Sequence, residues 1–209
     1  MKIIHQTAEY AVVCKAAGED SEHDLPGLLA GQNGDRAADY YVVHRLDKAA
    51  SGLLVLARDR QTAGELSRQL TENRLRKSYL CVVPGVPEPA SGEMQDLLYK
   101  DKMKKKMFPV KRKRAGVKEA SLRYQVLETQ ASLTLVEVEL KTGRFHQIRC
   151  QFAARKLPLV GDGKYGSRVR SPHLALFCRQ LSFYDAKEKK ECSFTAAPPA
   201  EFPWEIFYD

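Results

Sequence analysis

The sequence predicts an α+β fold with a largely antiparallel sheet and a few helices between the strands. Apolar runs of strand length outnumber segments with helical spacing, and the two kinds do not alternate regularly along the chain. The 209 residues are 44% hydrophobic and 29% charged, which is typical of a folded globular protein and excludes a disordered chain. At this length we expect residues 1–209 to form a single domain.

The first half of the chain contains strand-like runs and one helical segment. Tyr10–Lys15 and Tyr40–Val43 are short apolar runs, and Ser51–Arg58 is continuously apolar, as in a strand buried on both faces. A helix is expected next, with Asp59 as its N-cap and apolar residues at three- and four-residue spacing. Ser78–Val83 is predicted as a further strand that ends at a Pro-Gly pair.

The second half begins with a predicted loop around Pro87, Pro89 and Gly92. Two paired strands, one helix and two closing strands are predicted after it, at Ala120–Glu128, Ser132–Leu140, His146–Lys156, Leu174–Tyr184 and Cys192–Phe194. Strands therefore dominate the second half as well.

The charge of the chain is concentrated in one window. The formal net charge is +8, and Lys100–Arg114 holds nine basic residues and one acidic residue, so the rest of the chain is balanced. Such a window indicates a nucleic-acid partner, but a localisation signal or a membrane-surface patch has the same composition, and a solvated charge run is its usual meaning. Short alternating stretches inside the window are compatible with a hairpin.

Cysteine usage and hydropathy indicate the compartment. The five cysteines are far apart and form no C-x-x-C pair, which indicates reduced thiols in a cytoplasmic protein without a zinc site. No apolar run approaches the roughly 18 residues that span a membrane, and the start of the chain lacks a secretory signal. We therefore expect no membrane association and no bound metal.

His44-Arg-Leu-Asp47 is the first candidate for chemistry. It lies directly before the buried strand at Ser51–Arg58, so its carboxylate would be held rigidly and still be open to a ligand. The alternative is an aspartate that caps a turn, with Arg45 as its surface partner. A protein-kinase catalytic loop is excluded because the other kinase motifs are absent.

The segment Lys141–Arg149 is the second candidate. A predicted strand ends before it and a predicted helix begins within it, and free N–H groups at a helix start favour an anion. A phosphate or the carboxylate of Asp47 would fit there. An ordinary basic helix start is the alternative. The polar side chains at this helix start are Arg144, His146, Gln147 and Arg149.

Gly161–Gly166 matches the pattern G-x-G-x-x-G letter for letter. A dinucleotide site requires these glycines to open a helix, whereas the residues that follow have no apolar helical face and lead to Pro172. A tight, glycine-dependent turn is the better interpretation.

Three motifs lie in order along the chain, and the third of them is divided between two segments. They are HRLDKAASGLLVLA at His44–Ala57, RKSYLCVVPG at Arg76–Gly85, TGRFHQIR at Thr142–Arg149, and the pieces LVGD and YG within Leu159–Gly166. A weaker match, VVCKAAG, covers Val12–Gly18. Together they resemble the motifs of the RluA-type pseudouridine synthases, in the order of that family and over nearly the whole chain. The resemblance implies an α+β fold with a mixed, mainly antiparallel sheet in two lobes, flanking helices and a central active cleft.

The resemblance also implies a role for individual residues. Asp47 corresponds to the aspartate that attacks the target uridine, and Arg149 to the basic residue that pairs with it. Tyr79 corresponds to the tyrosine that stacks on the target base and assists late proton removal, and Arg45 to an arginine that helps to displace the target nucleotide. The other expected substrate contacts at the motifs are His44, Arg144, His146 and Gln147. Because the reaction is an isomerisation, no cofactor is expected.

Departures from the family pattern leave subfamily and substrate open. Ala50 replaces the usual Thr, Ala17 the usual Pro, and Cys150-Gln151 the common Val-His. Because the first motif begins at His44, we expect no S4 RNA-binding domain before it, and RNA must be held by the catalytic domain itself or by a partner.

The implied protein is a monomeric, cytoplasmic enzyme that flips a uridine out of ribosomal or transfer RNA. The basic window is expected to line the RNA cleft through Lys104, Lys105, Lys106 and Lys111, with Met103, Met107 and Phe108 anchoring it to the body. The chief alternative is a synthase-like fold that has lost activity and serves as an RNA-binding factor. A nucleotide-cofactor enzyme is the second alternative.

Overall fold

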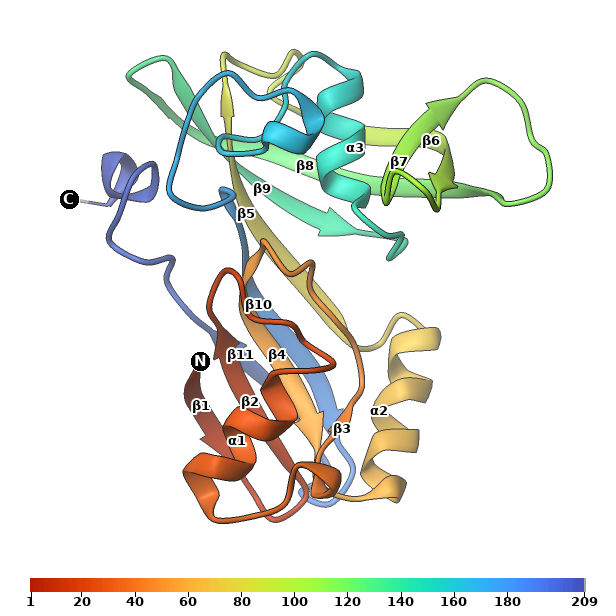
Figure 1. Ribbon diagram of the computed structural model, residues 1–209, viewed down its shortest axis with the longest axis vertical. Helices are drawn as coiled ribbons and strands as arrows, with labels where there is room; N and C mark the ends of the chain where they lie inside the picture. Colours follow the sequence, from red (N-terminus) through yellow and green to blue (C-terminus); the bar gives the residue numbers. More distant parts are fainter. Residues whose placement is uncertain (209) are drawn as a thin grey trace. The chain divides into compact units, whose positions relative to one another are not determined.

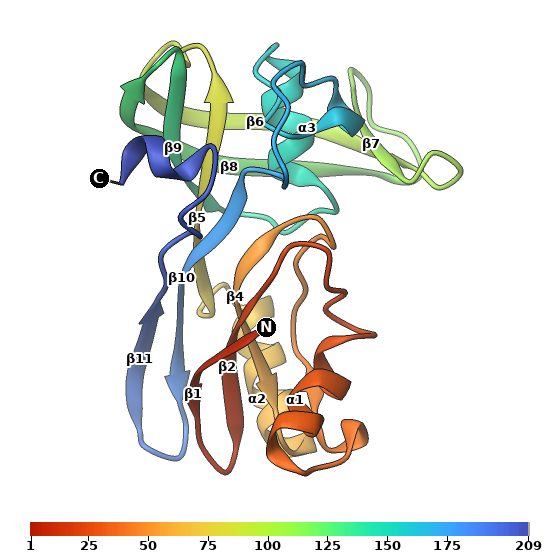
Figure 2. The same ribbon diagram turned by 60° about the vertical axis from the view of Figure 1, so that its left-hand side comes forward.

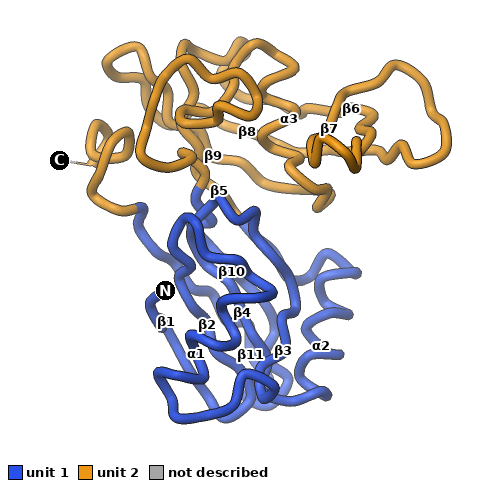
Figure 3. Tube along the Cα trace, in the orientation of Figure 1, with its two compact units in different colours: residues 1–77, 177–198 blue, residues 78–176, 199–209 orange. Residues whose placement is uncertain are grey.

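The computed structural model describes residues 1–208 and divides the chain into two compact units (Figure 3). Unit 1 comprises Met1–Lys77 and Phe177–Pro198. Unit 2 comprises Ser78–Leu176 and the C-terminal residues from Pro199 on. Each unit is therefore assembled from two separate segments of the chain.

Unit 1 is a sheet with two helices and a short 3-10 turn (Figure 1). The sheet order is β1-β2-β4-β10-β11, with the short β3 also paired to β4, and every pairing is antiparallel except that of β4 with β10. All seven residues of β4 are buried, as the continuous apolar run predicts. The elements are β1 (Lys2–Gln6), β2 (Tyr10–Lys15), α1 (Leu25–Asn33), η1 (Ala37–Asp39), β3 (Tyr41–Val42), β4 (Ser51–Ala57), α2 (Arg60–Thr71), β10 (Leu176–Asp185) and β11 (Lys190–Thr195).

The helix α2 packs against β4 and begins where the sequence predicts. The Asp59 carboxylate accepts a hydrogen bond from Thr62 N at 2.8 Å, which caps the helix. Near its other end the Gln69 side chain donates to Tyr184 O and accepts from Tyr184 N, both at 2.8 Å. The helix is thereby tied to β10 as well.

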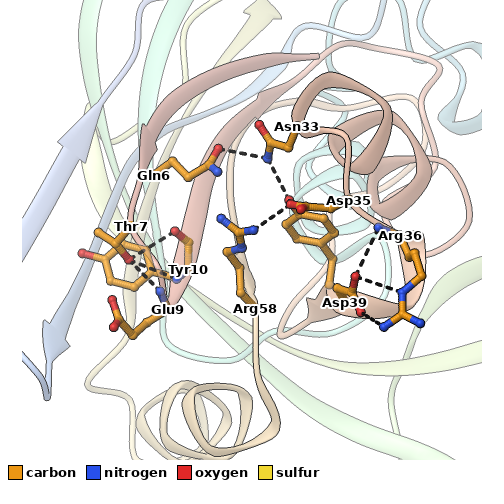
Figure 4. A network of polar contacts seen from close by, with 10 residues as sticks. Gln6, Thr7, Glu9, Tyr10, Asn33, Asp35, Arg36, Asp39 and Arg58 are labelled. Carbon is orange, nitrogen blue, oxygen red and sulfur yellow. Dashed lines mark hydrogen bonds and ion pairs between the residues drawn. The ribbon is translucent and has the colours of Figure 1, made fainter.

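A polar network holds the segment after α1 (Figure 4). The Asp35 carboxylate accepts from Tyr40 Oη and from Arg58 Nη2, the latter at 2.6 Å. Asn33 Nδ2 donates to Tyr40 Oη at 2.7 Å and to Gln6 Oε1 at 3.1 Å. The network thus joins β1, the end of α1, the chain before β3 and the residue after β4.

Unit 2 is an antiparallel sheet of order β5-β9-β8-β6-β7, with α3 against one of its faces (Figures 1 and 2). Its elements are β5 (Arg76–Pro84), β6 (Ser91–Asp101), β7 (Lys106–Val110), β8 (Val117–Gln130), β9 (Leu133–Leu140), α3 (Gln147–Ala154) and the 3-10 turns η2 (Gly163–Tyr165) and η3 (Trp204–Phe207). A core cluster lies between α3 and the sheet and consists of Leu98, Met107, Ala120, Cys150 and Tyr165.

Most of the predicted elements are confirmed. The hairpin inside the basic window is β6–β7, in which Asp101 pairs with Lys106. The predicted loop extends too far, because Gly92 lies in β6 opposite Tyr124. The five cysteines are free thiols. Within residues 1–208, no helix is long and apolar enough to cross a membrane.

Candidate active site

The loop that carries Asp47 is held by hydrogen bonds on both sides of this residue. Before it, Leu46 N donates to Ser21 Oγ and the Ser21 hydroxyl donates to Leu46 O, both at 3.2 Å. After it, Lys48 O accepts from Gly18 N at 2.8 Å. Asp47 itself is half-buried, and Ala50 N donates to its carbonyl oxygen at 2.9 Å. The backbone at Asp47 is therefore fixed before any ligand binds.

A buried lysine lies under this loop. Lys15 is only 1% exposed, and its Nζ donates to Ala16 O and Glu19 O at 2.9 Å and to Lys48 O at 3.2 Å. Burial lowers the pKa of Lys15 to about 8, and the negative charges of Glu19 and Asp47 limit the decrease. An ammonium group thus satisfies three loop carbonyls close to the Asp47 carboxylate.

The two residues before Leu46 have opposite environments. His44 is buried, its Nε2 accepts from Val55 N at 3.4 Å, and its Nδ1 has no hydrogen-bond partner. Burial, and then the charge of Lys77, hold the pKa of His44 well below its usual value, so the ring is neutral. Arg45 is exposed and forms an ion pair with Glu22 at 3.0 Å, and an exposed pair of this kind leaves the arginine available to a ligand.

In unit 2, Arg149 forms a buried pair with Asp162. Arg149 Nε donates to Asp162 Oδ2 at 2.7 Å, and Nη2 donates to Oδ1 at 2.8 Å. Both side chains are at least nine-tenths buried, and the guanidinium also lies 5.2 Å from the centre of the Tyr165 ring. This bidentate geometry fixes the plane of the guanidinium.

His146 belongs to a chain of hydrogen bonds that reaches the hairpin. Its Nδ1 lies 3.1 Å from Tyr165 Oη, and Met107 N donates to the same oxygen at 2.9 Å. Burial, and then the positive charge of Arg149, lower the pKa of His146 to about 3, so the ring is neutral near pH 7. His146 also has φ of 48°, which places a left-handed residue at the N-cap of α3.

We expect this histidine to make the protein less stable in acid. An unfolded histidine takes up a proton near its usual pKa of 6.5, whereas folded His146 stays neutral down to about pH 3. Between these values the unfolded state binds more protons, so the free energy of unfolding falls as pH falls below 6.5, by about 2 kcal/mol at pH 5 from this group. Urea unfolding at pH 7 and pH 5 measures the loss.

A matched pair of variants assigns this effect. In His146→Gln the loss between pH 7 and pH 5 should shrink by about 2 kcal/mol, whereas in His23→Gln, where the histidine is exposed, it should stay at the parent value. An equal loss in both variants would contradict the role of His146.

The turn before α3 is organised by Gln147. Its Oε1 accepts from Arg144 N at 2.9 Å and from Thr142 Oγ1 at 2.8 Å, and its Nε2 donates to Ser121 O at 3.1 Å. Arg144 Nε donates to Glu119 O at 2.9 Å. The structure thus gathers the four polar residues of this motif within one unit, three of them buried: His146, Gln147 and Arg149.

The glycine-rich stretch is a turn, as predicted. Gly161 has φ of 78°, and a Cβ on it would lie 2.3 Å from His173 O, while Gly166 has φ of 89°. Only the short 3-10 turn η2 follows the first glycine, so the stretch opens no helix for a dinucleotide. Its use is to place Asp162 and Tyr165 beside Arg149.

Three site residues were not predicted: Lys15, Asp162 and Tyr165. Each lies inside a segment that carries the family resemblance, which is the one signal that could have drawn attention to them. Tyr79, which was predicted, is buried on β5 opposite Val138. Asp47 belongs to unit 1, whereas Tyr79 and Arg149 belong to unit 2, so their meeting stays a prediction.

The basic window forms the β6–β7 hairpin and the segment after it. Lys104 N donates to Asp101 Oδ1 at 2.9 Å, Lys164 Nζ to Lys105 O at 2.9 Å, and Lys106 Nζ to Lys164 O at 2.6 Å. The anchoring role predicted for Met103 is wrong, because it is 94% exposed on the turn of the hairpin. Met107 is buried in the core cluster, and Phe108 is half-buried.

The comparisons with known proteins agree with one another. The sequence model of a family described as RNA pseudouridylate synthase matches residues 8–154. The chain is 34% identical over 152 residues to "RNA pseudouridine synthase 2, chloroplastic" of Arabidopsis thaliana, covering 70% of this chain and 35% of the relative. It is 34% identical over 125 residues to "Ribosomal large subunit pseudouridine synthase D" of Borreliella burgdorferi, covering 60% and 38%. The chain thus spans little more than a third of either relative.

A solved structure is similar over almost its full length. The structure titled "Human RNA Pseudouridylate Synthase Domain Containing 4" shares 27% sequence identity and a TM-score of 0.77 with this chain, covering 95% of this chain and 88% of that one. Fold and sequence therefore lead to the same family.

Proposed function

This chain belongs to the RNA pseudouridylate synthase family, and on that premise we propose that it isomerises uridine to pseudouridine in RNA. The observation that carries the proposal is the loop around Asp47, which is pinned on either side by Ser21 and Lys15. A nucleophile that must attack one atom of a flipped nucleotide needs a rigid backbone and an ionised carboxylate. Both are supported by the buried ammonium of Lys15 beneath the loop.

The proposed reaction needs only groups of the protein. Asp47 attacks the uridine at the sugar or the base, the N1–C1′ bond breaks, and the turned uracil rejoins C1′ through C5. The bond between Asp47 and the nucleotide breaks again before the product leaves, so the free carboxylate is regenerated. The proton of C5 leaves to solvent while N1 regains one, so no cofactor or metal takes part. Tyr79 stacks on the base and assists the loss of the C5 proton, Arg149 pairs with Asp47, and Arg45 helps to displace the nucleotide from its stack. Stacking on an aromatic ring is worth about 1–3 kcal/mol, which offsets part of the cost of unstacking.

Ribosomal RNA is the first choice of substrate and transfer RNA the second. The Borreliella relative is named for the large ribosomal subunit, which supports this order. We further propose that the chain acts as a monomer, as one catalytic domain, and in the cytoplasm. Free thiols at all five cysteines support a reducing compartment.

The activity is tested by tritium release. RNA transcribed with 5-tritiated uridine loses its label to water when C5 forms the new glycosidic bond. We expect the purified protein to release one label per modified uridine, and mapping pseudouridine in cellular RNA with and without the protein identifies the position. An absence of release from both ribosomal and transfer RNA would favour the alternative of an inactive RNA-binding factor.

We expect the hairpin lysines to contribute to RNA affinity through phosphate contacts. Replacing Lys104, Lys105, Lys106 and Lys111 by Gln should reduce the slope of log Kd against log salt by about 3, because each contact to a single strand contributes roughly 0.7. Filter binding between 50 and 300 mM salt measures the slope.

A second basic cluster provides the control. Lys187, Lys189 and Lys190 are exposed at the turn between β10 and β11 in unit 1, and their replacement by Gln should leave the slope unchanged. Equal slopes in the two variants would indicate that the basic window is a solvated charge run that does not contact RNA.

A further inference from the structure

A groove in unit 2 lies beside the turn before α3. Its cavity volume is about 550 Å³, and its lining comes from β6, the β7–β8 connection, the start of β8 and Arg144. The lining residues are Leu97, Lys113, Arg114, Val117, Lys118, Glu119 and Arg144. This volume is in the range of small-ligand sites and is large enough for a nucleotide.

The rim of the groove is strongly positive. It holds four basic side chains and one carboxylate, that of Glu119. Lys113 Nζ pairs with Glu119, and this contact lowers the pKa of Glu119, so the carboxylate is ionised and neutralises a single lysine. Three positive charges remain for a ligand, which favours an anion and disfavours a metal ion.

The two arginines of the rim are oriented by a carbonyl oxygen and by an aromatic ring. Arg144 Nε donates to the carbonyl oxygen of Glu119 at 2.9 Å, and the Arg114 guanidinium lies 4.8 Å from the centre of the Tyr99 ring. Within residues 1–208, neither guanidinium forms an ion pair. Their planar donor groups are therefore oriented and still available, which suits the oxygens of a phosphate.

The floor of the groove is apolar. Leu97 and Val117 are both half-buried, on neighbouring strands, and they lie among the lining residues. A cationic rim over an apolar floor fits a nucleotide, with its phosphate on the arginines and its sugar or base below, better than it fits a free inorganic anion.

We infer that this groove binds a nucleotide of the RNA next to the target uridine, by its phosphate. The choice of ligand rests on the proposed function. Arg144 lies in the turn that leads to His146 and into α3, the helix that carries Arg149, so a phosphate bound there fixes the RNA strand close to that motif. The groove then acts as a positioning site for the strand.

The test is a comparison of salt slopes in the full chain. In the double variant Arg114→Gln/Lys118→Gln, the slope of log Kd against log salt for RNA should fall by about 1.5, at roughly 0.7 to 0.9 per lost contact. In Arg170→Gln, where an exposed arginine of unit 2 lies outside the groove lining, the slope should not change. Equal slopes in the two variants would overturn the inference. Circular dichroism confirms that each variant is folded.

Two competitors identify the source of the phosphate. NMR titration should shift the amide signals of Val117 and Lys118 with an RNA oligonucleotide, and with uridine monophosphate only at far higher concentration. Two results together would overturn the assignment to RNA. They are saturation of the groove by uridine monophosphate and, in the double variant, a salt dependence of RNA binding equal to that of the parent protein. Equally strong shifts with polyglutamate would overturn it in favour of an acidic peptide. All of these experiments measure binding and not catalysis. A protein that released no tritium would therefore overturn the proposed function but would leave open whether the groove binds RNA.

Discussion

Replacing Asp47 by Asn is expected to lower the rate of tritium release from RNA by about 10⁴-fold or more, the scale of losing a nucleophile. The amide has nearly the size of the carboxylate but cannot attack carbon. The backbone bonds at Leu46 and Lys48 do not involve the Asp47 side chain, so the loop keeps its path. RNA binding should therefore remain close to that of the parent protein. Single-turnover tritium release and filter binding measure the two quantities separately.

Asp24→Asn is the matched control. The negative charge of Asp24 also limits the decrease in the pKa of Lys15, and the Asp24 carboxylate accepts a hydrogen bond from Asp20 N at 2.7 Å. This variant makes the same chemical change near the same lysine but leaves Asp47 in place, so activity should stay within a few-fold of the parent. If Asp47→Asn released tritium at nearly the parent rate, Asp47 could not be the nucleophile.

Replacing Gly52 by Ala is expected to destabilise the protein by about 4 kcal/mol or more, or to prevent folding. Gly52 lies on the fully buried β4 with φ of 112°, a conformation that side chains rarely adopt. A Cβ there would lie 2.4 Å from both the backbone nitrogen and the carbonyl oxygen of Cys178, on the paired strand β10. Neither backbone atom can move without breaking the pairing of the two strands. Urea unfolding followed by circular dichroism measures the effect.

Gly64→Ala is the control for this substitution. Gly64 lies within α2, and a Cβ on it would meet nothing within 4 Å. Here alanine should stabilise the protein by about 0.5–1 kcal/mol, because glycine is a poor helix former. If Gly52→Ala were as stable as Gly64→Ala, this result would contradict the close approach of β4 and β10 at Gly52.

The elements that the sequence predicts well are those with a strong local pattern. The uninterrupted apolar run of β4 and the N-cap at Asp59 needed no knowledge of the rest of the chain. The family resemblance, carried by three ordered motifs, is confirmed by the match over residues 8–154. By contrast α1 was not predicted, because Gly27 and Gly31 lower its helix propensity and the burial of Leu25 and Leu29 depends on the rest of unit 1.

The parts of the site that the sequence could not predict depend on distant backbone atoms. The ammonium of Lys15 is satisfied by the carbonyl oxygen of Lys48, 33 residues away, and no spacing rule leads from one to the other. The anchoring role predicted for Met103 was wrong for a different reason. An apolar residue in a charged run suggests an anchor, but the turn of the hairpin places it outside while Met107, four residues on, enters the core.

The pairing of β4 with β10 has a consequence for synthesis of the chain. Gly52 and Cys178 are neighbours in the sheet but 126 residues apart in sequence. At about 5–20 residues per second, this part of β4 would wait roughly 6 to 25 seconds for its partner strand to leave the ribosome. During that interval the start of β4 has an open edge, and open strand edges promote the aggregation of nascent chains. Unit 1 therefore cannot complete its sheet until the chain has been synthesised past residue 178, after most of unit 2.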